Sequence, residues 1–415
     1  MFTVKEISVN QKPWFPQLPI QVWILAVGRV LTEIGNGLVI FYAPILFVNQ
    51  VGLSATAVGI GIGSGAIGGV IGRFIGGSFA DSPMVGRRGT LLLSAVISAS
   101  ADFVFVNTHN LPIFILGNLL MSLGIGLYWP PREAVVADVT TDQQRDEAFA
   151  VMRLVDSIGL GLGVMLGGLL ISANVDYRIL FAIDGISFLV FFSVVYVALG
   201  ETGEFTEHNS NQGLQSWLAV LGDRPMMVFL VVNILFTTYH SLLHSAMPLY
   251  LSNFVHAGGL SAGRIGSLFT WHMVFGALCQ LPLTRWLNRF SHPNALTISM
   301  LLWGVGFGLM WVTGVAPMAV LWAILALSIM GAAVSAYIPA AAAYIVDVAP
   351  ESMMGVYFSI FSQCWAIGYF IGPSLGGWAL DRSRYIADGF WLAAAVSVGL
   401  GILILQYLQG IIKKN

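Results

Sequence analysis

The chain has 415 residues, of which 57% are hydrophobic and 9% are charged, and its formal net charge is −2. A soluble domain carries about a quarter charged residues, so this composition excludes water as the main solvent and indicates a protein surrounded by a lipid bilayer. The sequence contains no long basic or acidic run, and we therefore expect no nucleic-acid partner.

Twelve apolar segments follow one another along the chain. Each has the roughly 20 mostly apolar residues that a membrane-spanning helix needs. They lie near 18–47, 54–80, 89–108, 111–137, 147–173, 176–199, 224–254, 262–288, 293–314, 317–345, 352–380 and 387–410. The pattern predicts an all-α membrane protein with twelve transmembrane helices in two six-helix halves.

The longest break between apolar segments divides the chain into six helices on each side. The expected parts are a tail (1–17), an N-terminal half (18–199), a linker (200–222), a C-terminal half (223–410) and a second tail (411–415). The first tail lacks a short apolar core followed by small residues, so we expect no cleavable signal peptide. Ten basic residues fall on one side of the predicted membrane and four on the other, which places both termini in the cytoplasm.

The two predicted halves share a sequence pattern. A shift of 209 residues aligns 130–168 with 339–377 without a gap, and eleven positions agree. These include matched proline, aspartate and glycine residues, which a biased apolar composition explains poorly. The match indicates a duplicated half, an architecture in which transporters place the substrate site between the halves near the middle of the membrane.

The loop after the second predicted helix carries a charged motif, Gly77-Ser-Phe-Ala-Asp81-Ser-Pro-Met-Val-Gly86-Arg87-Arg88. It resembles the G-x-x-x-D-R-x-G-R-R loop of the major facilitator superfamily, with two extra residues before Gly86. The resemblance implies a latch on the cytoplasmic side, in which the acid caps a helix end and the arginines reach an acid that Asp138 matches. Arginine and carboxylate form a charge-assisted contact that must break when this side opens. Basic residues that only orient the protein in the membrane are the alternative.

A glycine motif recurs at the same place in both halves. In the fifth predicted helix, Gly163, Gly167 and Gly168 resemble the G-P-x-x-G-G signature of proton-coupled antiporters of that family, with Val164 in place of proline. The second copy is complete and consists of Gly372, Pro373, Gly376 and Gly377. Small residues let helices approach closely and a proline allows a kink, so the motif suits either rocking of the halves or plain close packing.

A further resemblance narrows the family. The run Pro130-Pro131-Arg132-Glu133, followed by Gln143-Gln144-Arg145, is similar to bacterial multidrug-efflux members of the twelve-helix drug:proton antiporter branch. The arginine that this branch carries in its fourth helix is absent, since Leu120 stands four residues before Gly124.

Ionisable residues within the predicted helices are concentrated in the first half. Such residues are costly in hydrocarbon and usually mark a pathway or relay. We expect the second half to hold only histidines, whereas the first half holds Arg29, Glu33, Arg73, Asp102, Arg132, Glu133, Arg153, Asp156 and Asp184. The first half is therefore the predicted coupling half, with Arg132 and Glu133 among the candidates.

Two spacings suggest proton-coupling pairs. Arg29 and Glu33 are four residues apart and share a helix face, and Arg153 and Asp156 are three apart. Burial favours the protonated form of a carboxyl group and a nearby arginine favours the ionised form, so separating such a pair would change its proton affinity. We expect Glu33 to be the first candidate, Asp156 the second, and Asp102 and Asp184 weaker ones; a static buried salt bridge is the alternative.

Histidines and aromatic residues mark a candidate cavity wall in the second half. His240 and His244 have a metal-ligand spacing, but no acidic or cysteine partner lies nearby in sequence, so we expect no metal. Aromatic side chains suit a large apolar or cationic substrate. The cavity candidates are Tyr239, His240, His244, Trp271, His272, Tyr337, Gln363 and Trp365.

These observations favour a monomeric inner-membrane transporter that exports an amphipathic organic compound or drug in exchange for protons and needs no cofactor. A uniporter or symporter for a metabolite such as a sugar or lipid-like molecule is the second hypothesis. A non-transporting sensor or assembly factor is a third, although the tails and linker are short. An enzyme is not expected, because no nucleophile–base pairing or metal cluster is recognisable.

Overall fold

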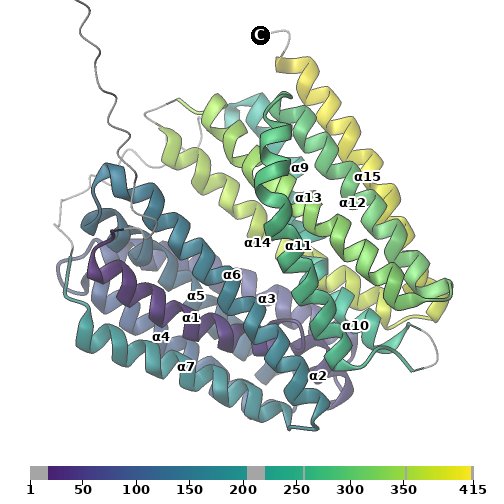
Figure 1. Cartoon of the computed structure of the whole chain (residues 1–415), viewed down its shortest axis with the longest axis horizontal. Coiled ribbons are helices and arrows are strands. Elements are labelled where there is room, and N and C mark those ends of the chain that lie inside the picture. Colours follow the sequence, from purple (N-terminus) through teal and green to yellow (C-terminus); the bar gives the residue numbers. More distant parts are fainter. Residues whose placement is uncertain (1–16, 203–219, 256–257, 351–352, 413–415) are drawn as a thin grey trace, which may run out of the picture.

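The computed structural model describes residues 17–202, 220–255, 258–350 and 353–412, and Figure 1 shows two bundles of helices. The first bundle contains α1 (Ile20–Ile40), α2 (Ala43–Asn49), α3 (Ala55–Ala80), α4 (Gly86–Val106), α5 (Leu111–Val139), α6 (Asp142–Ser172) and α7 (Tyr177–Ala198). The second contains α9 (Arg224–His244), α10 (Ala246–Asn253), α11 (Ala262–Leu287), α12 (His292–Val315), α13 (Ala319–Val348), α14 (Met354–Leu380) and α15 (Arg384–Ile412).

These helices form twelve spans. The short helices α2 and α10 continue α1 and α9 after a local break, and each pair makes one apolar span. Pro44 and Pro248 lie in the first turns of α2 and α10. Proline has no amide hydrogen to donate to the preceding helix. Ten spans are long and apolar enough to cross a membrane, and α11 and α14 are equally long but less apolar. The predicted fold, twelve helices in two six-helix halves, is confirmed.

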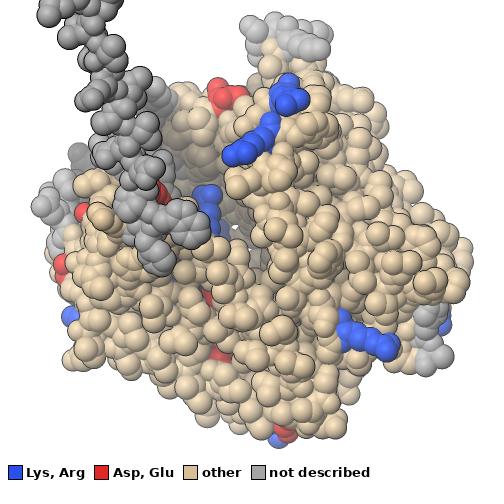
Figure 2. Space-filling model, viewed as in Figure 1, with Lys and Arg blue, Asp and Glu red and all other residues tan. Residues whose placement is uncertain are grey.

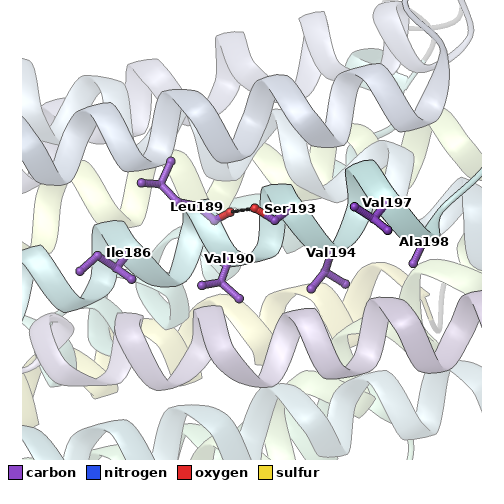
Figure 3. Close-up of a pocket in the computed structure, with 7 residues that line it drawn as sticks. All are labelled: Ile186, Leu189, Val190, Ser193, Val194, Val197 and Ala198. Carbon is purple, nitrogen blue, oxygen red and sulfur yellow. Dashed lines mark hydrogen bonds between the residues drawn. The ribbon is translucent and has the colours of Figure 1, made fainter.

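The outer surface of the bundles is apolar. Phe74, Phe103 and Val396 are more than two-thirds exposed, and charged residues are sparse over the face seen in Figure 2. A shallow groove of about 500 Å³ runs along the outer side of α7 between Ile186 and Ala198. Its only polar side chain, Ser193, donates to the Leu189 carbonyl of its own helix (Figure 3). This groove suits contact with lipid chains, and the residues that line it include no ionisable side chain.

The repeated glycines make equivalent contacts in the two halves. Gly163 lies against Gly37 of α1, as Gly372 lies against Thr238 and Ser241 of α9. Gly168 faces Ala262 at the start of α11, as its counterpart Gly377 faces Ala55 at the start of α3. The first match packs helices within a half, and the second joins the two halves.

The halves meet at one side of the protein and diverge at the other. We call the side where α1 begins and α15 ends the terminal side; Figure 1 shows the bundles separating toward it. On the opposite side, the Asp381 carboxylate accepts from the backbone amides of Ala55 (2.7 Å) and Thr56 (2.6 Å), and so caps α3 across the interface. Asn49 and Asn253 exchange side-chain hydrogen bonds of 2.9 Å there as well. The structure is therefore closed on the opposite side.

Candidate transport cavity and its charged lining

A cavity of about 400 Å³ lies between the halves, and the molecular surface is hollowed there in Figure 2. The first half contributes residues of α1, α3, α4, α5 and α7, and the second half contributes residues of α9 and α14. Small residues on α3, among them Gly65, Ala66 and Gly69, make room for it. Its wall is mainly apolar with a few polar groups, which is typical of a site for a small organic molecule.

Three of the predicted cavity residues line this space: His244, Gln363 and Trp365. His240 stands behind them, with its ring edge-on to Trp365 at 5.1 Å between centroids. Its Nδ1 lies 3.1 Å from the hydroxyl of Tyr369, which also lines the cavity. The second half thus contributes an aromatic wall that carries one histidine.

The other four predicted cavity residues lie elsewhere. Tyr239 is bonded through its hydroxyl to Ser397 of α15 at 2.6 Å, and Tyr337 donates to Asn233 at 2.9 Å. His272 is buried against the Leu327 carbonyl of α13 (2.8 Å). Trp271 donates to Ser328 and is 41% exposed. The positions of these residues in the sequence could not show that their side chains face neighbouring helices of the same half.

Four charged residues of the first half form a network, which we call the charge quartet: Arg29, Glu33, Arg132 and Asp156. Arg29 forms ion pairs with Glu33 and with Asp156 (2.7 Å), and Arg132 reaches the other oxygen of Asp156 at 3.0 Å. Two positive and two negative charges therefore balance each other. The guanidinium of Arg29 also lies 4.5 Å from the ring centre of Tyr128, a cation–π contact.

The quartet corrects the second predicted pair. Asp156 bonds to Arg29 and Arg132 and not to Arg153, which is exposed on α6. Glu133 is exposed at the terminal end of α5, where the charges of Arg73, Arg132 and Arg153 act on it. A spacing of three residues along a helix would allow Arg153 to contact Asp156, but Arg29 of α1 is a more buried partner for the Asp156 carboxylate.

Two aspartates lie deeper in the first half. Asp102 of α4 and Asp184 of α7 both line the cavity, and each is 1% exposed. We call them the aspartate pair. Glu33 lies close enough to Asp184 for their charges to interact, so the pair and the quartet are neighbours.

The charged loop lies within the first half at the terminal side. Arg87 pairs with Asp138 of α5, and the backbone amides of Arg87 (2.9 Å) and Arg88 (3.1 Å) donate to Glu201. Gly86 adopts a positive φ of 68°, which favours glycine. Asp81 ends α3, and its backbone amide donates to the carbonyl of Gly77. Glu201, which the sequence did not single out, therefore caps the helix end instead of Asp81.

Two acids of the second half were missed in the sequence. Asp381 caps α3 across the interface, as described above. Asp388 lies inside α15 and accepts from the Tyr250 hydroxyl at 2.6 Å, with Arg384 at 3.6 Å. The expectation that the second half holds only histidines is therefore wrong. Among the described residues, no group of three metal-ligating side chains is present.

A membrane protein with two six-helix halves around one cavity belongs to the class of transporters built from repeated halves. The model of the Major Facilitator Superfamily matches residues 25–263 and 241–410, and the chain belongs to this family.

Known relatives are similar over most of the chain. Quinolone resistance protein NorA of Staphylococcus aureus (strain MSSA476) is 22% identical over 91% of this chain and 95% of its own length. A Na(+), Li(+), K(+)/H(+) antiporter of Planococcus maritimus is 24% identical over 73% of this chain and 77% of its length. The crystal structure of nucleoside transporter NupG superposes with a TM-score of 0.75 at 14% identity, over 95% of this chain and 99% of that one. These relatives agree on a multi-pass membrane transporter.

Proposed function

We propose that this protein exports an amphipathic organic compound, such as a lipophilic cation, in exchange for protons across the inner membrane. The observation that carries the proposal is the cavity between the halves, which combines an aromatic wall with buried carboxylates. Aromatic faces and carboxylates attract an organic cation, and the same carboxylates bind protons. One site would thus hold substrate and proton in turn.

In this proposal the terminal side faces the cytoplasm, as the distribution of basic residues favours. The described state is then open inward and closed outward. Transport requires the contacts of Asp381 with α3 and of Asn49 with Asn253 to break, while the halves close on the terminal side. Gly168, Gly377 and Pro373 lie at the contacts between the halves and suit such rocking.

The charge quartet is the proposed link between motion and proton affinity. Glu33 pairs with Arg29 and accepts from Asn36, which lines the cavity. A movement of α1 that draws Arg29 away leaves Glu33 without its positive partner, and an isolated buried carboxylate takes up a proton. Glu33 is thus the proposed proton acceptor in transit. The names of the relatives, drug resistance for one and cation/H(+) exchange for another, support exchange with protons.

The test uses purified protein in vesicles with an imposed pH gradient and tetraphenylphosphonium as the probe. We expect accumulation of the cation that depends on the gradient and is lost with a proton ionophore, and that is strongly reduced in Glu33→Gln. If the flux of the cation through the wild-type protein does not depend on the pH gradient, a uniporter would be favoured. Binding without flux of any tested organic solute would favour the non-transporting hypothesis.

A further inference from the structure

The aspartate pair differs from every other buried acid cluster in the described chain because it has no positive partner. Both oxygens of Asp102 are buried without a hydrogen-bond partner. Asp184 has only a long contact of 3.5 Å with the Ser187 hydroxyl, which donates to the Asp184 backbone carbonyl at 2.7 Å. An unpaired charge in such a place costs several kcal/mol, on the order of the desolvation of one ion.

The two carboxyl groups are close to each other. Asp102 of α4 lies against Gly185, the residue that follows Asp184 on α7, and the charges of the two aspartates interact. A Cβ atom added to Gly185 would lie 3.1 Å from the Cβ of Asp102 and 3.8 Å from its Oδ2. Two neighbouring buried carboxylates without a positive partner disfavour each other's ionisation, so one of them takes up a proton or the pair binds a cation.

The surrounding elements supply no counter-charge. From α1, Glu33 adds a further negative charge, and Gly35 lies directly against Asp184. The cavity wall beside the pair holds Asn118 and Ser122 of α5, and Arg73 of α3, whose charge acts on Glu133. Across the cavity, the second half contributes His244. No described arginine, lysine or histidine forms an ion pair with either aspartate.

Aromatic side chains close the pair off from the opposite side. Phe105 follows Asp102 by one turn and Phe181 precedes Asp184 by one turn, and their rings are 5.1 Å apart between centroids. Phe114 and Phe47 complete this aromatic floor. Phe105, Phe114 and Phe181 line the cavity together with the pair. The pair thus communicates with the cavity and is shielded from the far side.

We propose that Asp102 and Asp184 share one proton in this inward-open state, and that they form the site from which a cation entering the cavity displaces it. The proton neutralises one carboxyl group and leaves a single negative charge on the pair. The role in displacement rests on the proposed function, whereas the proton occupancy does not. Glu33, already paired with Arg29, does not hold this proton here.

The occupancy is tested by infrared spectroscopy of the purified full chain in lipid at neutral pH, without substrate. We expect the absorption of a protonated carboxyl group in the wild type, and its loss only in the double variant Asp102→Asn/Asp184→Asn, since one remaining buried carboxyl group without a positive partner still holds a proton. The absorption is expected to persist in Glu33→Gln, the matched substitution of a buried acid that has an arginine partner.

Several outcomes would overturn the proposal. The wild type alone decides it if the double variant fails to fold: no protonated carboxyl absorption at neutral pH contradicts a shared proton. Loss of the absorption on adding sodium or potassium chloride, with choline chloride as control, assigns the site to an alkali cation instead. Its loss in Glu33→Gln but not in the double variant Asp102→Asn/Asp184→Asn moves the proton to the quartet. A normal absorption together with no transport of tetraphenylphosphonium would leave the aspartate pair standing and reject the exporter.

Discussion

The charge quartet and the aspartate pair are two clusters of buried acids in the same half. The negative charges have positive partners in the first cluster and none in the second. In the quartet, two arginines balance two carboxylates, and each guanidinium also lies over an aromatic ring. In the aspartate pair, two carboxyl groups meet without a counter-charge. The comparison teaches that burial alone does not mark an occupied proton site: in this state the balanced network keeps its charges without a proton, whereas the unbalanced pair needs a cation.

The largest expected effect is on coupling. In vesicles with the double variant Asp102→Asn/Asp184→Asn we expect gradient-driven accumulation of tetraphenylphosphonium to fall to the level of empty vesicles, because neither amide can exchange a proton. Movement of the cation down its own gradient should persist, which separates lost coupling from lost folding. Accumulation at the wild-type level in this variant would remove the distinction between the two clusters.

The free energy of unfolding should show the reverse order, with a larger loss for a substitution in the charge quartet than for one in the aspartate pair. Arg29→Met leaves Glu33 and Asp156 short of a positive partner, and breaking a buried ion pair in this way costs about 3–5 kcal/mol. The double variant Arg29→Met/Glu33→Gln should recover part of that loss, because the charges balance again. Asp102→Asn removes an unpaired acid and should be neutral or stabilising. Unfolding of the purified proteins in detergent measures all three; equal losses in Arg29→Met and Asp102→Asn would contradict the comparison.

A smaller effect is expected at the interface that shields the aspartate pair. Asp381→Ala removes the cap on α3, and loss of a helix cap costs about 1–2 kcal/mol, or roughly a tenfold shift in population. More molecules should then open on the opposite side. An impermeant thiol reagent applied from that side to Ser122→Cys, in a background without Cys279 and Cys364, measures the shift. Unchanged labelling would show that this cap does not hold the state closed.

The smallest effect is expected at Asp138, outside both clusters. Asp138→Asn removes a partly exposed ion pair with Arg87, worth about 0.2–1 kcal/mol. Its counterpart in the repeat, Asp347, is 61% exposed and pairs with His292 at 2.7 Å, so Asp347→Asn is the matched control and should change stability less. Unchanged stability in Asp138→Asn would show that the Arg87 contact is dispensable for folding, and a larger loss at Asp347 would contradict the expected order.

The fold was predictable because the apolar segments indicate the helices and the duplicated glycines indicate the repeated half. Gly163 and Gly372 are needed where helices touch, so their positions recur in the sequence. The partner of each charged side chain was harder to predict. Arg29 lies four residues from Glu33, and this ion pair could be inferred from helix geometry; its second partner, Asp156, is 127 positions away.

The aspartate pair shows what the sequence lacked. Asp102 and Asp184 appeared as two isolated weak candidates, because nothing in the chain indicates that α4 and α7 bring them together. Likewise, Tyr239 and His272 share helices with cavity residues but point to neighbours within their own half. The direction of a side chain on an apolar helix depends on packing, which a helix with no clear polar face does not reveal.

The most direct test of the account is proton release on substrate binding, recorded as the pH of a weakly buffered detergent solution of the protein when tetraphenylphosphonium is added. We predict release of one proton per protein molecule in the wild type and in Glu33→Gln, and none in the double variant Asp102→Asn/Asp184→Asn. Binding of the cation without release in the wild type, or release that is lost in Glu33→Gln and retained in the double aspartate variant, would contradict it.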